Sequence, residues 1–163
     1  MKWSPTSWEE YGTFVEFAVR GAYAGGVRHF ETWNEPVPYA YWMGPIESVV
    51  KLHEVTHKAV KRVAPDAVVL GPCPYSFVWG FLEKYFELGG AQWLDHVVIH
   101  AYGGNPDQDF VENLRKLRDM LKKYDLGDRD VYITEKGFST PHFSERQQAH
   151  NLVKTYVYCL SEG

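Results

Sequence analysis

The sequence has few of the features that would place a protein outside the soluble globular class. Its 163 residues include only two cysteines, Cys73 and Cys159. That is too few for a disulfide-stapled scaffold, so both are expected to be free core thiols. No apolar run approaches the roughly 18 residues of a membrane span. The first residues also lack the apolar core of a signal peptide. No membrane partner is therefore expected, and the compartment stays open.

Basic side chains are not in excess either. The 17 Lys and Arg residues stand against 21 Asp and Glu residues, which leaves a net charge of −4. A nucleic-acid-binding surface needs a basic patch, so no nucleic acid partner is expected. Hydrophobic residues, by contrast, make up 45% of the chain and aromatic residues 16%. This content is enough to form the core of one domain over residues 1–163.

Strand-like and helix-like segments alternate along the chain. Short apolar, β-branched or aromatic segments, each followed by Gly, Pro or Asn, are typical of strands; they cover residues 27–33, 67–71, 96–102 and 130–135. Apolar residues at helical spacing predict helices at about 8–24, 45–64, 77–88, 109–124 and 144–160.

This alternation predicts an α/β fold of parallel βα units with right-handed crossovers. Four parallel strands and five helices fit either a small doubly wound sheet or a partial (βα)8 TIM barrel. A whole barrel typically needs about 250 residues, and this chain opens on a helix with no preceding strand. The chain is therefore expected to be either a complete four-stranded α/β domain or a piece of a larger barrel.

Two glutamates stand where predicted strands end. Glu35 follows the first strand and is followed by Pro36, and Glu135 is the last residue of the fourth strand. Parallel strands end at the same edge of a barrel, so both side chains are expected at one rim. Two carboxyl groups in different environments, one protonated and one ionised, are what glycoside hydrolysis requires.

The segments around these residues resemble a known group of enzymes. Trp33-Asn34-Glu35-Pro36 and Ile133-Thr134-Glu135-Lys136-Gly137 look like the paired signatures of clan A glycoside hydrolases, which are retaining (βα)8-barrel enzymes. With residues 30–36 and 96–102 included, the chain is most similar to family 39 and its neighbours, which include β-xylosidases. The resemblance implies a C-terminal-half fragment of the barrel, from about helix three to helix seven.

The same resemblance implies roles for individual residues. Glu35 would be the acid/base and Glu135 the nucleophile. Asn34 would bond the sugar 2-hydroxyl, Tyr102 would lie near the nucleophile, and His100 belongs to the matching sixth-strand motif. The substrate would be an oligosaccharide, a polysaccharide or another glycoside, with no metal and no cofactor.

Three further side chains are candidates for supporting the site. Trp33 and Trp42 lie at or after a strand end, where an aromatic face would stack on a pyranose; packing in the core or at the rim is the alternative for each. Glu31 lies on the same strand face as Glu35 and is expected to pair with a His or Arg.

A competing motif points to zinc chemistry. His53-Glu54-Val55-Thr56-His57 matches H-E-x-x-H on a predicted helix, the pattern of zinc metallopeptidases. The helix also has an apolar face on which both histidines lie, or which they border. Partly packed histidines, with Glu54 on the solvated side, are therefore the favoured interpretation.

A non-catalytic carbohydrate-binding half barrel is the third hypothesis. Half a barrel leaves strand edges and inward apolar side chains uncovered on the strands that begin at Val27 and Asp130. Self-association through these edges is therefore expected, with two copies related by a two-fold axis as one arrangement.

Overall fold

The computed structural model describes residues 3–103 and 105–162. It contains one sheet of four parallel strands in the order β1-β2-β3-β4: β1 (His29–Glu31), β2 (Val68–Pro72), β3 (His96–His100) and β4 (Val131–Glu135). The helices are α1 (Trp8–Ala24), α2 (Ile46–Val63), α3 (Trp79–Glu87), α4 (Phe110–Lys123) and α5 (Glu145–Glu162), with a short 3-10 helix, η1 (Gly90–Trp93).

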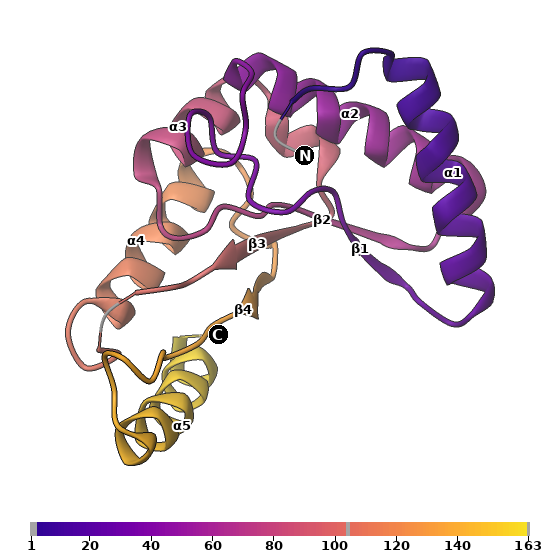
Figure 1. The fold of residues 1–163 in the computed structure, drawn as a ribbon. Coiled ribbons are helices and arrows are strands. Elements are labelled where there is room, and N and C mark those ends of the chain that lie inside the picture. The colour runs from indigo at the N-terminus through magenta and orange to yellow at the C-terminus, as the bar shows by residue number, and fades with distance from the viewer. Residues whose placement is uncertain (1–2, 104, 163) are drawn as a thin grey trace.

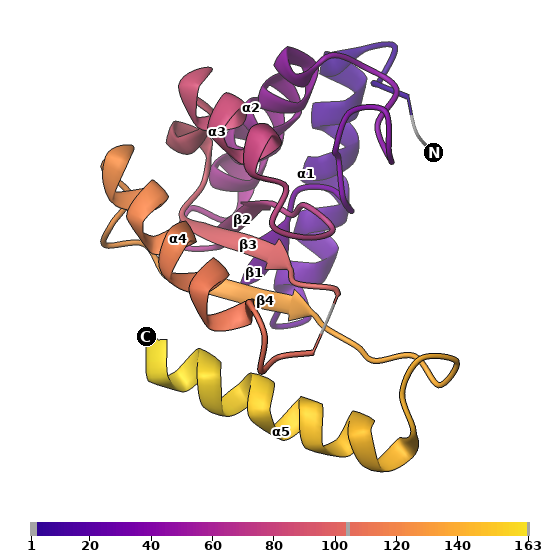
Figure 2. The same ribbon diagram turned by 90° about the vertical axis from the view of Figure 1, so that its left-hand side faces the viewer.

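The helices form an arc on the outside of the strands, as in part of a (βα)8 barrel (Figure 1). The α/β half barrel expected from the sequence is therefore confirmed, and the doubly wound sheet is not what forms. Figure 2 shows β2, β3 and β4 running in the same direction, so their carboxyl ends meet at one edge.

Local sequence signals account for much of this order. The side chain of Ser7 accepts a hydrogen bond of 3.2 Å from the backbone N–H of Glu10, which is the N-cap expected for α1. The predicted strand at 27–33 is shorter in the structure, because only His29–Glu31 pairs with β2. The residues after Glu31 instead leave the sheet and carry site side chains.

The main core lies between the helices and the outer face of the sheet. Its largest fully buried side chains come from α2, α3, α4, β3 and the loop after β1: Trp42, Tyr85, Leu52, Leu82, Ile99, Leu117 and Leu121. A separate small cluster of Leu70, Cys73 and Val98 packs with Tyr132.

The rings of His29 on β1 and Tyr132 on β4 lie 6.0 Å apart, although these strands are at opposite ends of the sheet order. The sheet is therefore strongly curved.

Both ends of the sheet are open within the described residues. β1 and β4 each pair with only one neighbour. The flanking helices expose apolar side chains, Phe14 and Phe17 on α1 and Val153, Val157 and Leu160 on α5. In the described part of the chain, no helix is both long and apolar enough to cross a membrane.

Candidate active site

The loop after β1 places Glu35 at the carboxyl edge of the sheet. Glu35 has a φ of 52°, in the left-handed region that non-glycine residues seldom adopt. Its carbonyl accepts a hydrogen bond of 2.7 Å from the N–H of Val37, which closes a tight turn. The residue is only 8% exposed. A strained backbone and a buried acid together are typical of a functional position.

An irregularity in the sheet places Glu135. The pairing of β3 with β4 shifts between Val98 and His100, so that β4 carries one extra residue. As a result His100, fully buried at the end of β3, stands opposite Glu135. Such bulges re-aim side chains, and they are common beside active sites.

His100 lies between the carboxylates. Its Nδ1 is 3.1 Å from Oε1 of Glu35 and 3.5 Å from Oε2 of Glu135. Oxygen atoms of Glu35 and Glu135 lie within 4.8 Å of each other. Carboxyl groups about 5–5.5 Å apart suit direct attack on a sugar, whereas about 6.5–9.5 Å is needed to admit a water between sugar and base. An approach of two oxygens to within 4.8 Å is compatible with the shorter of these separations.

Tyr102 completes this part of the site. Its hydroxyl donates a hydrogen bond of 3.1 Å to Oε2 of Glu135. The proximity of Tyr102 to Glu135 implied by the resemblance is thus present in the structure. Partial burial, and then the bond to Glu135, raises the pKa of the Tyr102 hydroxyl above 10.0, which keeps it a donor at neutral pH.

The other nitrogen of His100 faces two more ligating groups. Its Nε2 is 3.5 Å from Oε2 of Glu31, so Glu31 pairs with a histidine as the sequence predicted. The thiol of Cys73, directly after β2, lies in the same cluster. Burial, and then the charge of Glu31, raises the pKa of this thiol well above 9.0. No sequence motif predicted that Cys73 would lie in this cluster, and it was expected only as a core thiol.

The aromatic candidates separate into different environments. Trp33 is half-buried and meets Trp42 edge to face at 5.5 Å. Trp42 is fully buried, and its Nε1 donates to the hydroxyl of Ser48. The expectation that Trp42 contacts a sugar is therefore wrong, because core packing encloses the ring. Asn34 is exposed at the rim next to Glu35.

A hollow beside Tyr102 was not foreseen. It has a volume of about 590 Å³, and its lining includes Tyr102, Phe138, His142 and Phe143. Phe138 and Phe143 meet edge to face at 5.5 Å. Both follow β4 at the same edge of the sheet as Glu135. In the sequence, only their position after a predicted strand end indicated that these two phenylalanines could line a site.

The H-E-x-x-H segment has a structural role. His53 is fully buried, with Nδ1 2.8 Å from the carbonyl of Val49, and its ring packs edge to face on Tyr85. His57 Nδ1 instead faces the carbonyl of Trp93, and Glu54 pairs with two lysines. Among the described residues, neither histidine belongs to a group of three potential metal ligands. This geometry argues against the zinc metallopeptidase alternative.

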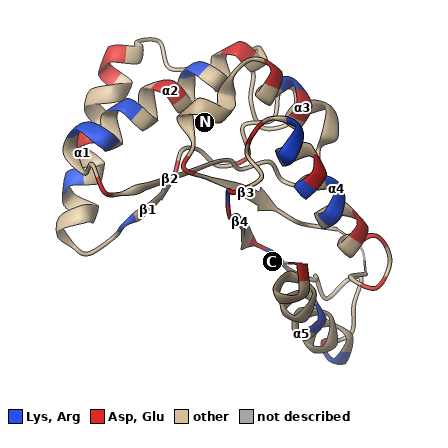
Figure 3. Cartoon of the chain, turned by 180° about the vertical axis from the view of Figure 1, so that it is seen from behind, with Lys and Arg blue, Asp and Glu red and all other residues tan. Residues whose placement is uncertain are grey.

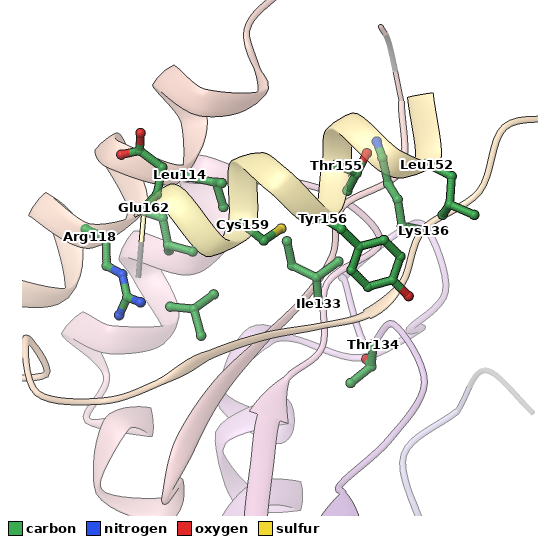
Figure 4. Close-up of a pocket in the computed structure, with 12 residues that line it drawn as sticks. Leu114, Arg118, Ile133, Thr134, Lys136, Leu152, Thr155, Tyr156, Cys159 and Glu162 are labelled. Atoms are coloured by element: carbon green, nitrogen blue, oxygen red, sulfur yellow. The ribbon is translucent and has the colours of Figure 1, made fainter. Parts of the chain in front are cut away.

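A second hollow, of about 280 Å³, lies under α5. Figure 4 shows Cys159, Tyr156 and Thr155 of α5 above Ile133 of β4, with Lys136 at one end. Thr134 and Lys136 line it, whereas Glu135 between them faces His100.

In the view of Figure 3, acidic and basic residues are interspersed along the helices.

The chain is a half barrel that is similar to glycoside hydrolases in sequence and in fold. In sequence, the chain is 28% identical over 157 residues to a β-xylosidase of Geobacillus stearothermophilus, an alignment that covers 82% of this chain and 31% of that protein. No protein-family profile matches the chain.

Solved structures agree on the fold. A glucosidase from Croceicoccus marinus matches 97% of the chain with a TM-score of 0.81 and 23% identity, over 37% of its own length. A family 39 glycoside hydrolase from Bacteroides cellulosilyticus WH2 matches 94% of the chain, with a TM-score of 0.74, 24% identity and 35% of its own length. The chain is thus similar in fold to a family 39 glycoside hydrolase and in sequence to a β-xylosidase, and it spans about a third of the length of these proteins.

Proposed function

We propose that this chain carries the catalytic carboxylates of a retaining glycoside hydrolase. The observation that supports this most directly is the close approach of Glu35 and Glu135, whose oxygens lie within 4.8 Å across His100. The two side chains leave different strands at one edge of the sheet, which is where the active sites of (βα)8 barrels are built.

The proposed reaction has two steps. Glu135 attacks the anomeric carbon and forms a glycosyl ester, while Glu35 gives its proton to the departing glycosidic oxygen. Glu35 then takes a proton from water, whose oxygen attacks the anomeric carbon and releases Glu135. His100 and Tyr102 hold the two carboxyl groups in position through the contacts described above. Asn34, exposed at the rim, would bond the sugar.

The proposed substrate is a glycoside, either an oligosaccharide or a polysaccharide. The similarity to a β-xylosidase makes β-xylosides the first to test. The hollow next to Tyr102 supports this class, since its lining includes two phenylalanine rings that would give a pyranose ring an apolar surface.

The decisive experiment traps the covalent intermediate. The chain is incubated with an activated 2-deoxy-2-fluoro-β-xyloside, digested and analysed by mass spectrometry, and the sugar is expected on Glu135. Replacement of this residue by glutamine should abolish labelling and lower aryl-xyloside turnover by several powers of ten. Glu35→Gln should slow turnover most for glycosides with poor leaving groups, because these need the acid.

Glu87→Gln is the matched control, since Glu87 is an exposed glutamate on α3 whose partner is Lys84. It should leave turnover unchanged. Labelling of another residue, or equal turnover by the wild-type chain and Glu135→Gln, would overturn the proposal. Saccharide binding with no turnover in any variant would instead support the non-catalytic alternative.

A further inference from the structure

Three different ligating groups converge beneath the proposed catalytic pair. They are the carboxylate of Glu31 from β1, the thiol of Cys73 after β2 and Nε2 of His100 from β3. One ligand atom from each lies within 4.8 Å of the other two. We propose that these residues form a binding site for a thiophilic divalent cation, with Zn²⁺ as the ion that fits.

The donor set is the first argument for this choice. Thiolate, imidazole and carboxylate are the ligands that Zn²⁺ uses, whereas Mg²⁺ and Ca²⁺ select oxygen ligands. Three protein ligands leave a fourth tetrahedral position for water. The neighbouring set of Glu35, His100 and Glu135 lacks sulfur, so it is the poorer site for a thiophilic ion.

The spacing is the second argument. The 3.5 Å between Nε2 of His100 and Oε2 of Glu31 is long for a hydrogen bond. It is close to the edge of a tetrahedron around zinc, which is about 3.3–3.5 Å for bonds of about 2.0–2.1 Å. Sγ of Cys73 lies within 4.8 Å of both atoms, so small adjustments of the side chains would bring all three ligand atoms to one ion.

Two of the three ligands are buried, and the third is partly exposed to solvent. Cys73 and His100 are fully buried, which gives a rigid and dry pair of ligands. The Glu31 side chain is 30% exposed and offers a route of entry from solvent. On binding, the Cys73 thiol loses its proton to solvent and a Zn–S bond forms, so one proton is released per ion.

Occupation of the site would regulate the chemistry, a consequence that rests on the proposed function. An ion on Nε2 leaves the His100 proton on Nδ1, which then donates to Glu35. A His100 ring held by an ion can no longer turn with the two carboxyl groups that it contacts, so Zn²⁺ should slow hydrolysis and a chelator should restore it.

Metal binding is tested directly, without reference to turnover. The chain is titrated with Co²⁺, a spectroscopic substitute for Zn²⁺, and with Zn²⁺ by calorimetry. A single site with a thiolate-to-cobalt charge-transfer band is expected. Cys73→Ser should abolish the band and weaken Zn²⁺ binding at least about tenfold, since even outer-shell changes cost 10–100-fold.

Cys159→Ser is the matched control, because Cys159 is the second free thiol and lies under α5, away from the cluster. It should bind both ions like the wild-type chain. Absence of 1:1 binding, equal affinity in Cys73→Ser, or loss of the band in Cys159→Ser would each overturn the proposal. Zn²⁺ binding by a chain without glycosidase activity would support the site and count only against the proposed function.

Discussion

Oε2 of Glu135 lies 3.1 Å from the hydroxyl of Tyr102, which donates to it, and only 3.5 Å from Nδ1 of His100. One oxygen of the proposed nucleophile thus accepts a hydrogen bond from Tyr102 and lies close to His100, at the end of β3. The other oxygen has no hydrogen bond among the described residues.

Removal of the Tyr102 hydroxyl tests this arrangement. Tyr102→Phe keeps the ring and deletes a hydrogen bond to a charged group, worth about 1.5–3 kcal/mol. We expect kcat/KM for aryl xylosides to fall about 10–100-fold, with little change in stability because Tyr102 is 44% exposed. Tyr39→Phe, at a 93% exposed tyrosine, is the control. An unchanged kcat/KM in Tyr102→Phe would contradict this role.

Acid stability should depend on His53. Burial lowers the pKa of its imidazole from 6.5 to about 4, so between these pH values the unfolded chain binds more protons than the folded one. The free energy of unfolding should therefore fall as the pH drops through this window, by about 3 kcal/mol for this residue alone. Urea unfolding of His53→Leu should show a correspondingly flatter pH profile, and an equally steep profile would contradict the assignment.

Two glycines should respond to alanine in opposite directions. A Cβ on Gly90 would lie 2.4 Å from the buried ring of Tyr85, whose hydroxyl donates to the Gly90 carbonyl. Gly90→Ala should cost about 3 kcal/mol through overpacking. Gly80, in α3, has open space around an added Cβ, so Gly80→Ala should stabilise by about 0.5–1 kcal/mol. Thermal unfolding of both variants decides this, and a stable Gly90→Ala would contradict the packing described.

Helix α5 should be much less protected than α2 in hydrogen exchange. Within the described residues it buries only Asn151 and Thr155, and the hollow of about 280 Å³ lies beneath it. α2, which buries six residues, is the internal standard. Amides in α5 should exchange well before those in α2, because opening α5 exposes little apolar surface. Equal protection would show that something else holds α5 in place.

The open ends of the half barrel predict self-association. The free edges of β1 and β4 present unpaired backbone groups, and α5 exposes Val153 and Leu160 nearby. We expect the mass measured by sedimentation to rise with concentration. Leu160→Glu, at an 83% exposed leucine, should reduce the rise, and a monomer at all concentrations would contradict it.

Much of this arrangement was predictable from local signals. The N-cap at Ser7, the apolar stripes of the helices and the β-branched run before Glu135 are short-range patterns, and the elements form close to where those patterns lie. For Trp42 the sequence left contact with a sugar and packing in the core both open, because its place after a strand end does not say which way its ring turns. Packing against Trp33 and Ser48 decided that.

Parallel strands all present their carboxyl ends to one edge, and for that reason the sequence by itself placed two glutamates at a common rim. Their separation was decided only by the folded chain, through the bulge between β3 and β4 and the left-handed turn at Glu35. The same holds for the convergence of Glu31, Cys73 and His100, which come from three strands. Such contacts depend on sheet curvature and register, which are set by side chains distant in the sequence packing against one another.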